Sequence, residues 1–377
     1  MRQVRMGMVG GGRDAFIGAV HRMAARLDGR IELVCGAFSS DPERSRSSGR
    51  ELLVRRAYGT YEEMFENEKD LPEGERMELV SIVTPNHEHF PAARLALESG
   101  FHVMCDKPLA MSLDEARRLE ALVVKSGLRF GVTYNYSGYP MVKEARARVV
   151  AGELGTIRRV VVEYPQGWLA TRLEATGQKQ AEWRTDPNRA GASCCVGDIG
   201  THAAHLCEYV TGLRIVEVAS ELSTFVEGRA LDDDASLLLR LEGGARGVLW
   251  ASQIAIDEEN GLNLRVYGES GSLAWRQEEP NTLLLKWPYR PREIVRAGVN
   301  YDALSREALR ATRLPAGHPE GYIEAFANLY RSFASALLGE GELDCPTVHD
   351  GARGMAFIEA AVESSRANGK WTPIQET

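Results

Sequence analysis

Residues 1 to 130 alternate short apolar runs with stretches of helical pattern, and this rhythm constrains the fold more than any other feature of the chain. The apolar runs are VRMGMVG, IELVCGAF, LVSIVTP, FHVMC and LRFGVTY, and helices are expected between them, near 60–67 and 86–99 among others. Two capping boxes, Thr60-Tyr-Glu-Glu63 and Ser112-Leu-Asp-Glu115, mark helix starts. Strands that alternate with helices form βαβ units, so the pattern predicts a parallel sheet covered by helices.

From about residue 157 the sequence becomes rich in strands. The runs are IRRVVVEY, IVEVASELSTFV, ASLLLRL, RGVLWASQIAI, LNLRVYG, GSLAW and TLLLKW. Hairpin signals, Glu242-Gly-Gly244 and Glu269-Ser-Gly271, separate several of them. This part therefore predicts a mostly antiparallel sheet with one open face.

The length of 377 residues exceeds what one compact core usually holds, so we predict two domains. An α/β domain is expected over 1–136 and an α+β domain over 137–345. Helical text over 346–369 is expected to pack back on the first domain.

The composition limits the kinds of partner. A formal charge of -8 and a pI near 5.7 predict no nucleic-acid surface. Charges interrupt every apolar run before the ~18 residues of a membrane span. The N-terminus passes from MRQVR into a glycine-rich turn, which leaves no room for a signal peptide, so a cytoplasmic protein with a small-molecule partner is expected.

Two clusters raise the question of a metal. The first is a set of three cysteines and two histidines, namely Cys194, Cys195, Cys207, His202 and His205. It lacks the paired C-x-x-C spacing of structural zinc, so we expect reduced thiols in a loop and a helix. The run 232–234 is three aspartates without the D-x-D-x-D-G pattern of a calcium loop, and we expect a solvated turn there. No metal is predicted.

The glycine-rich turn MGMVGGGRDAFIGAVHRMAA (6–25) joins the first strand to the first helix. Gly10 and Gly12 match the first two positions of G-x-G-x-x-G, where a Cβ would block the approach of backbone N–H groups to a pyrophosphate. The third small residue is either Ala15 or Gly18, and with Gly18 the loop carries three extra residues. A turn without a ligand is the alternative, but the βαβ context favours dinucleotide binding.

The second strand is followed by Ser39, Ser40, Asp41 and, one turn later, Arg44. Small hydroxyls with an arginine suit the 2'-phosphate of NADP, whereas Asp41 suits the ribose hydroxyl of NAD. Both cofactors stay open.

The segment CCVGDIGTHAAHLCEYVTG (194–212) places Asp198 and His202 four residues apart. On a helix starting near Gly197 they share one face, beside a packing stripe that includes Ile199 and Leu206. An acid and an imidazole side by side suit the handling of a hydroxyl group, although such pairs are also common as surface or cap residues.

Six motifs occur in a fixed order along the whole chain. They are the glycine turn, TPNHEH (84–89), CDKPLA (105–110), YNYSGYP (134–140), WRTDP (183–187) and GDIGTH (197–202). In this order they resemble the Gfo/Idh/MocA family of dinucleotide-dependent sugar and cyclitol oxidoreductases, whose most specific mark is the lysine motif, EKP in most members. Asp106 stands here in place of the usual glutamate.

The resemblance implies a Rossmann domain followed by an open-faced sheet domain, and it implies roles for individual residues. Lys107, Asp198 and His202 are expected to be catalytic: His202 as acid/base, Lys107 polarising the reacting oxygen and Asp198 binding substrate. The expected cofactor contacts are Gly10, Gly12, Ala15, Phe16, Ile17, Ser39, Ser40, Arg44, Thr84, Pro85, Asn86, His89, Asp106, Lys107, Asn135, Trp183 and Arg184. The expected substrate contacts are Lys107, Tyr136, Gln166, Trp168, Lys179, Asp198 and His202.

These roles suit an alcohol oxidation, which removes a proton from oxygen and a hydride from carbon. We predict an NAD(P)-dependent oxidoreductase that interconverts a secondary hydroxyl and a ketone on a sugar, glycoside or inositol. Two alternatives fit the same resemblance: redox-assisted glycoside cleavage with a retained, recycled cofactor, and a non-catalytic metabolite sensor. The open sheet face needs cover, which predicts a homo-oligomer, either a dimer or a tetramer. Cys194 and Cys195 occupy a loop that is often glycine-rich in the family, where they narrow the pocket or only pack.

Overall fold

The computed structural model describes residues 2–13 and 15–376, which form two compact units. The first unit comprises residues up to Asn135 together with Tyr322–Ala352, and the second comprises Tyr136–Gly321 together with the residues from Arg353 onward. The sequence predicts a limit after residue 136 and a return over 346–369. In the structure the segment that belongs with the first unit is Tyr322–Ala352, because helix α11 (Tyr322–Leu337) packs on α1 (Phe16–Leu27). The residues from Arg353 onward belong to the second unit, so most of 346–369 does not return to the first.

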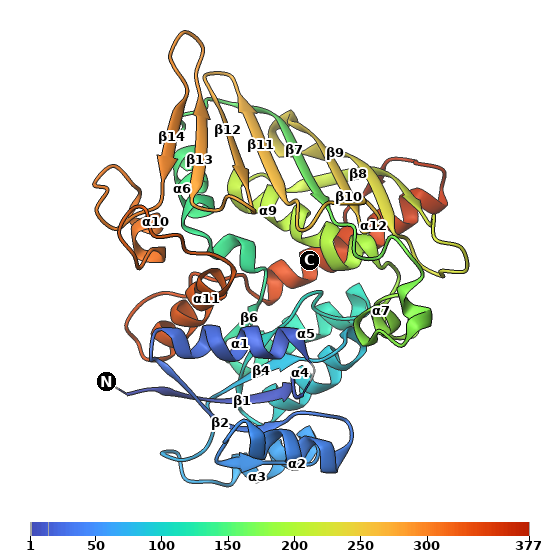
Figure 1. The fold of residues 1–377 in the computed structure, drawn as a ribbon, viewed down its shortest axis with the longest axis vertical. Helices are drawn as coiled ribbons and strands as arrows, with labels where there is room; N and C mark the ends of the chain where they lie inside the picture. Colours follow the sequence, from blue (N-terminus) through green and yellow to red (C-terminus); the bar gives the residue numbers. More distant parts are fainter. Residues whose placement is uncertain (1, 14, 377) are drawn as a thin grey trace. The chain divides into compact units, whose positions relative to one another are not determined.

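The first unit is a six-stranded parallel sheet in the order β3-β2-β1-β4-β5-β6 (Figure 1). Its strands are β1 (Val4–Gly10), β2 (Ile31–Ala37), β3 (Arg56–Ala57), β4 (Leu79–Val83), β5 (His102–Cys105) and β6 (Phe130–Val132). Its other helices are α2 (Pro42–Glu51), α3 (Tyr61–Lys69), α4 (His89–Glu98) and α5 (Leu113–Ser126). This confirms the predicted doubly wound fold, whose strand order reverses between β1 and β4.

Local signals in the sequence explain the helix starts. The Thr60 hydroxyl accepts a hydrogen bond from the Glu63 amide, and the Ser112 hydroxyl accepts one from the Glu115 amide. These are the two predicted capping boxes. The apolar side chains of β1 and α1 form one core with Phe326 and Phe333 of α11.

The second unit is a nine-stranded sheet in the order β14-β13-β12-β11-β7-β10-β9-β8-β15. Its strands are β7 (Ile157–Pro165), β8 (Ile215–Ser223), β9 (Asp234–Leu241), β10 (Arg246–Ser252), β11 (Asn263–Gly268), β12 (Ser272–Arg276), β13 (Thr282–Lys286), β14 (Glu293–Arg296) and β15 (Thr372–Pro373). Only β7 and β10 pair in parallel, so the prediction of a mostly antiparallel sheet is confirmed.

Helices cover one face of this sheet. The remaining helices are α6 (Pro140–Val150), α7 (Lys179–Arg184), α8 (Pro187–Ala190), α9 (Thr201–Thr211), α10 (Arg306–Ala311) and α12 (Val348–Arg366). α9 packs on β7 and β10, and α6 packs on β12 and β13 (Figure 1). Along β7 the buried residues Val160 and Val162 alternate with the more exposed Arg159 and Val161, as a sheet with one covered face requires.

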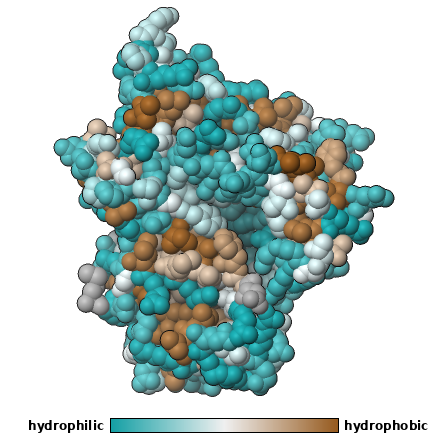
Figure 2. Space-filling model, viewed as in Figure 1, coloured by the Kyte–Doolittle hydropathy of each residue, from teal (hydrophilic) through white to brown (hydrophobic). Residues whose placement is uncertain are grey.

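None of the helices formed by the described residues combines the length and apolar character needed to cross a bilayer. The exposed residues of α1 are nevertheless mostly apolar: the side chains of Phe16, Met23 and Leu27 are 68%, 51% and 45% exposed, and Arg26 is the exposed charge among them. Figure 2 shows the resulting hydrophobic patch over this helix.

Candidate active site

The glycine turn after β1 has the backbone that a dinucleotide needs. Gly10 and Gly11 have φ angles of +81° and +70°, a region that favours glycine. A Cβ on Gly12 would lie 2.6 Å from the Phe38 carbonyl oxygen, and one on Gly18 would lie 2.3 Å from Gly11 Cα. Gly18 is thus the glycine that lets the helix pack on the turn, and the loop carries the longer of the two spacings that the sequence allowed.

The N-terminus of α1 faces this turn without a side-chain cap. Its N-cap residue, Ala15, has no acceptor for the amides of the first turn, and a helix N-terminus attracts phosphate. Arg22 donates to the Gly11 carbonyl and braces the turn from α1.

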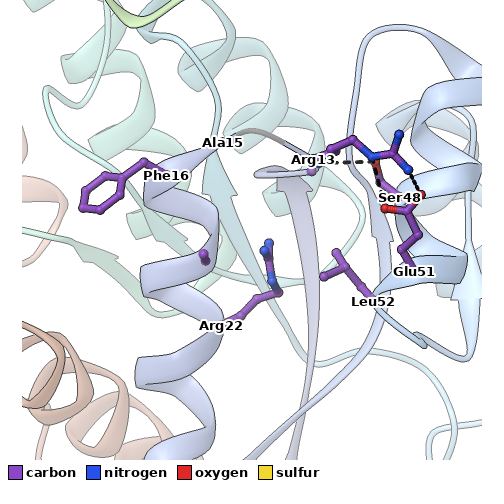
Figure 3. A pocket seen from close by; sticks show the side chains of 9 residues that line it. Arg13, Ala15, Phe16, Arg22, Ser48, Glu51 and Leu52 are labelled. Carbon is purple, nitrogen blue, oxygen red and sulfur yellow. Dashed lines mark hydrogen bonds and ion pairs between the residues drawn. The ribbon is translucent and has the colours of Figure 1, made fainter.

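A pocket of about 410 Å³ lies beside the turn, between α1 and α2 (Figure 3). It is lined by Gly12, Arg13, Ala15, Phe16, Ala19, Arg22, Ser48, Glu51 and Leu52. Three of these, Gly12, Ala15 and Phe16, are predicted cofactor contacts. Arg13 forms an ion pair with Glu51 at the α2 side of the pocket (Figure 3).

The end of β2 carries the residues expected at the adenosine ribose. The Asp41 carboxylate caps α2 by accepting from the Arg44 amide at 2.7 Å, and the Ser39 hydroxyl accepts from the Asp41 amide at 3.2 Å. Ser40 and Arg44 are exposed. Asp41 is therefore already engaged by the helix that it starts.

Buried polar atoms mark the ends of β4 and β6. Within residues 2–13 and 15–376, Thr84 Oγ1 and Asn135 Nδ2 are buried and have no hydrogen-bond partner. Pro85 follows Thr84, and the buried Asn86 begins a single 3-10 turn (Asn86–Glu88). Unsatisfied buried polar groups are costly, so these atoms fit a bound polar ligand. Together with the glycine turn, they fit a dinucleotide.

Lys107 follows β5 and is held through its backbone. Its amide donates to Asp106 Oδ1 at 3.0 Å, and the same oxygen accepts from Thr133 Oγ1 at 2.6 Å. Asp106, which replaces the usual glutamate, thus ties the lysine turn to the end of β6.

His89 is a predicted cofactor contact whose ring faces the protein backbone instead. Nδ1 lies 2.8 Å from the Pro108 carbonyl oxygen and Nε2 lies 2.9 Å from the Thr84 carbonyl oxygen. The ring is buried, and burial lowers its pKa. A neutral imidazole donates at one nitrogen only, so the ring bridges these two loops by one donated bond at a time.

In the second unit, Asp198 lies in a π-helix, η4 (Val196–Gly200), and His202 lies in the first turn of α9. The sequence predicts a helix starting near Gly197, and a helix does begin there, with its first turn in the π form. The hydrophobic period identifies a helix but does not distinguish the π form, which often occurs at functional sites.

The run 232–234 anchors this region, and the prediction of a solvated turn is wrong. Asp232 is buried and accepts from the Cys194 and Val196 amides at 2.9 and 3.1 Å and from Ser193 Oγ at 2.9 Å. Asp233 is also buried and pairs with Arg229 at 3.1 Å. The Asp232 carboxylate satisfies groups from a segment distant in sequence, which the run alone does not reveal.

Two side chains hold Asp198 Oδ2. Arg184 Nε donates at 3.2 Å and Gln253 Nε2 donates at 2.9 Å. Arg184 also lies over the Trp183 ring, with Cζ 4.2 Å from its centroid. Trp183 and Arg184 are predicted cofactor contacts. In the structure Arg184 contacts Asp198, which is a predicted substrate contact.

The His202 ring lies beside two tyrosines, which are linked in turn to amide side chains. Its ring centroid is 4.8 Å from that of Tyr136 and 6.4 Å from that of Tyr164, and the two tyrosine hydroxyls are hydrogen-bonded to each other. Asn260 Oδ1 accepts from Tyr164 and from Gln166, each at 2.7 Å. Burial raises the pKa of Tyr136, so its hydroxyl stays protonated.

The remaining predicted substrate contacts are Trp168 in the loop after β7, Lys179 in α7, and Lys107 in the first unit. Trp168 is half-buried, with its ring centroid 5.9 Å from Arg184 Cζ, and Lys179 is exposed at the start of α7. Lys107 belongs to the first unit, whereas Asp198 and His202 belong to the second. Sequence reasoning missed Tyr164, Gln253 and Asn260, because a strand residue and two loop residues carry no motif of their own.

Comparisons with known proteins bear on the fold and the family. A model of the oxidoreductase family with an NAD-binding Rossmann fold matches residues 4–134, and a model of the GFO/IDH/MocA C-terminal domain matches residues 142–274. An uncharacterized oxidoreductase of Bacillus subtilis, YfiI, is 35% identical over 99% of this chain and 98% of its own length. The levoglucosan dehydrogenase of Pseudarthrobacter phenanthrenivorans is 24% identical over 100% of this chain and 99% of its own.

An inositol dehydrogenase homolog from Azotobacter vinelandii has been solved with NAD+ and with NADH and myo-inositol. It is 38% identical to this chain, with TM-scores of 0.94 and 0.91, and the match covers 99% of this chain and 97% and 98% of those chains. The first unit is therefore an NAD-binding Rossmann domain, and the chain belongs to the Gfo/Idh/MocA family of oxidoreductases.

Proposed function

We propose that the protein interconverts a secondary hydroxyl and a ketone on a sugar, glycoside or inositol by hydride transfer with NAD(P). The observation that carries the proposal is the set of side chains around Asp198 and His202, because hydroxyl, amide and guanidinium groups converge there on an acid and an imidazole. A polyol presents several hydroxyls, and such a wall of donors and acceptors suits their recognition. The Azotobacter relative solved with myo-inositol supports this class of substrate.

The residues of the second unit handle the hydroxyl. Asp198 accepts a hydrogen bond from the substrate, and its carboxylate is oriented by the two donors on Oδ2. During oxidation a ring nitrogen of His202 accepts the proton of the substrate hydroxyl, and during reduction it returns that proton. An acid/base group positioned in this way is worth roughly 10²- to 10⁴-fold in rate.

Lys107 stabilises the negative charge that develops on the reacting oxygen, as a cation at the end of a parallel strand. When bound, the dinucleotide accepts or supplies the hydride. Gly10, Gly12, Ala15, Phe16 and Ile17 hold its pyrophosphate, Ser39, Ser40 and Arg44 its adenosine ribose, and Thr84, Pro85, Asn86 and Asn135 the remainder. The Asp41 carboxylate caps α2 through Oδ1, which leaves its second oxygen for a ribose hydroxyl, whereas Ser39, Ser40 and Arg44 suit a 2'-phosphate, so the site admits either NAD or NADP.

The test is to measure the near-ultraviolet absorbance of reduced dinucleotide after the protein is mixed with each of a panel of inositols, pyranoses and glycosides. NAD and NADP are assayed separately. We expect reduction of one cofactor with one polyol class. Lys107→Ala should lower kcat about 100- to 1000-fold, because it removes a charge that acts on the transition state. Lys125→Ala, an exposed lysine at the end of α5, is the matched control and should leave kcat unchanged.

Other results of these assays would support one of the two alternative functions or contradict the role of Lys107. Cleavage of a glycoside without accumulation of reduced cofactor identifies redox-assisted cleavage. Tight binding of dinucleotide and polyol without turnover of either identifies a sensor. Turnover that is unchanged in Lys107→Ala contradicts the role given to that residue.

We also propose that the open face of the second sheet is a homo-oligomer interface. One row of residues crosses eight paired strands on this face, namely Ala219, Leu238, Val248, Val161, Arg265, Ala274, Leu284 and Ile294. All but Arg265 are apolar, and Arg265 is paired with Glu163 at 2.8 Å. Leu238 and Ile294 are 51% and 68% exposed, and a largely apolar row of this kind marks an association surface.

A further inference from the structure

Asp198 is held by a side chain whose own position is closely defined. Gln253 follows β10 and is completely buried. Its backbone amide donates to the Asp233 carbonyl at 2.8 Å, and its carbonyl accepts from the Leu169 amide at 2.9 Å. Two segments that are distant in sequence therefore fix its backbone at this point.

The side-chain amide of Gln253 bridges two partners. Nε2 donates to Asp198 Oδ2 at 2.9 Å, and Oε1 accepts from Cys194 Sγ at 3.2 Å. An ionised carboxylate only accepts hydrogen bonds, so the nitrogen end of the amide must face Asp198. The oxygen end then faces Cys194, whose S–H must donate the hydrogen bond.

Cys194 is suited to be that donor. It is buried, and burial raises the pKa of its thiol well above the usual value, so the sulfur keeps its proton. Its backbone amide donates to Asp232 Oδ1 at 2.9 Å, which fixes the cysteine from behind. Cys195 is buried as well, but among the described residues it is Cys194 whose sulfur bonds to Gln253.

We propose that Gln253 is a positioning residue for substrate binding by Asp198, and that the Cys194 thiol holds the oxygen end of the Gln253 amide so that its nitrogen end stays on the carboxylate. This rests on the proposed function, because it takes Asp198 to be the residue that binds a substrate hydroxyl. It gives the two adjacent cysteines different roles: Cys194 orients an amide, and Cys195 packs.

The first experiment compares KM for the polyol, the dinucleotide Kd and the thermal midpoint in four variants. Gln253→Leu should raise KM about 10- to 100-fold, the effect of losing a hydrogen bond to a charged group. Cys194→Ala should raise KM about 2- to 10-fold, the effect of losing a neutral bond, and Cys194→Ser, which retains a donor, should restore it. Cys195→Ala is the matched control and should leave KM within about twofold of the wild type. The dinucleotide Kd should be unchanged in all four.

A second variant separates orientation from simple packing. Gln253→Glu keeps the shape of the side chain but places a carboxylate against Asp198, beside the Arg184 guanidinium that also donates to Asp198 Oδ2. One guanidinium offsets only part of the repulsion between two such close carboxylates, which favours a proton shared between them. The ratio of variant KM to wild-type KM should therefore fall as the pH is lowered, since a shared proton restores the hydrogen bond. A side chain that only filled space would give a ratio independent of pH.

Several results would overturn the proposal. Equal KM values for Cys194→Ala and Cys195→Ala would remove the role of the thiol, and a wild-type KM in Gln253→Leu would remove the role of the amide. Asp198→Asn tests the proposed function separately: if it raises KM while Gln253→Leu does not, only the present inference fails. If the wild type turns over no polyol, crystal structures of Cys194→Ala and Cys195→Ala still test the role of the Cys194 thiol. Only Cys194→Ala should displace the Gln253 amide and the Asp198 carboxylate.

Discussion

At the residue scale, one buried histidine illustrates how packing changes chemistry. His21 of α1 is fully buried, and the Tyr330 hydroxyl lies 2.7 Å from its Nδ1 and 2.7 Å from Ser81 Oγ. Within the described part of the chain, His21 Nε2 has no hydrogen-bond partner. A proton added there would be buried without an acceptor, and desolvation lowers the pKa of His21 to about 4.

This predicts a loss of stability in mild acid. A histidine whose pKa is lower in the folded than in the unfolded chain binds fewer protons when folded. Its contribution to stability is complete above about pH 6.5 and is lost as the pH falls toward 4. At about 1.4 kcal/mol per pKa unit, the loss approaches roughly 3 kcal/mol near pH 4.

Denaturant unfolding of the wild type and of His21→Phe between pH 7.5 and 4.5 measures this effect. His21→Phe should be less stable at pH 7.5, because Tyr330 and Ser81 lose a partner, but its free energy of unfolding should fall less steeply with pH. His318→Phe replaces an exposed histidine and should follow the wild-type slope. Parallel curves for all three proteins would contradict the assignment.

At the scale of elements, the π-helix η4 depends on a strand that lies far from it in sequence. Asp232 precedes β9, and its carboxylate accepts three hydrogen bonds from the segment Ser193–Val196, which leads into η4. Because Asp198 follows immediately, the geometry of the acid depends on this cap. The same segment carries Cys194, so the cap also supports the donor to Gln253.

Asp232→Ala should therefore lower the free energy of unfolding by about 2–4 kcal/mol, because it leaves two backbone amides and a hydroxyl without their acceptor. Asp234→Ala is the control in the same run. It removes one contact, to Trp250 Nε1 at 3.1 Å, and should cost about 1 kcal/mol or less. Chemical denaturation of both variants measures these free energies of unfolding. Equal losses of stability in the two variants would show that Asp232 is not the cap of this segment.

At the scale of the whole molecule, the open sheet face predicts the oligomeric state. Leu238→Glu combined with Val248→Glu places two charges at the centre of the apolar row and should convert the oligomer to a monomer in sedimentation velocity. Leu53→Glu, which changes an apolar residue that is 88% exposed in the first unit, should leave the oligomer intact. A monomeric wild type, or an unchanged double variant, would contradict the interface.

The sequence by itself determined the class of both sheets, the capping boxes, the glycine turn and the family, because these depend on local spacing, helical period and ordered motifs. Only the tertiary structure decided that Gly18 packs on Gly11, that the Asp232 run is buried rather than solvated, and that Asp198 is oriented by Gln253 and Arg184. The burial of Asp232 and the hydrogen bond from Gln253 to Asp198 depend on groups from distant segments that meet at 2.9 Å, and the approach of Gly18 to Gly11 depends on how the helix packs on the turn. Such meetings are set by how the sheets and loops close on one another, which periodicity along the chain does not encode.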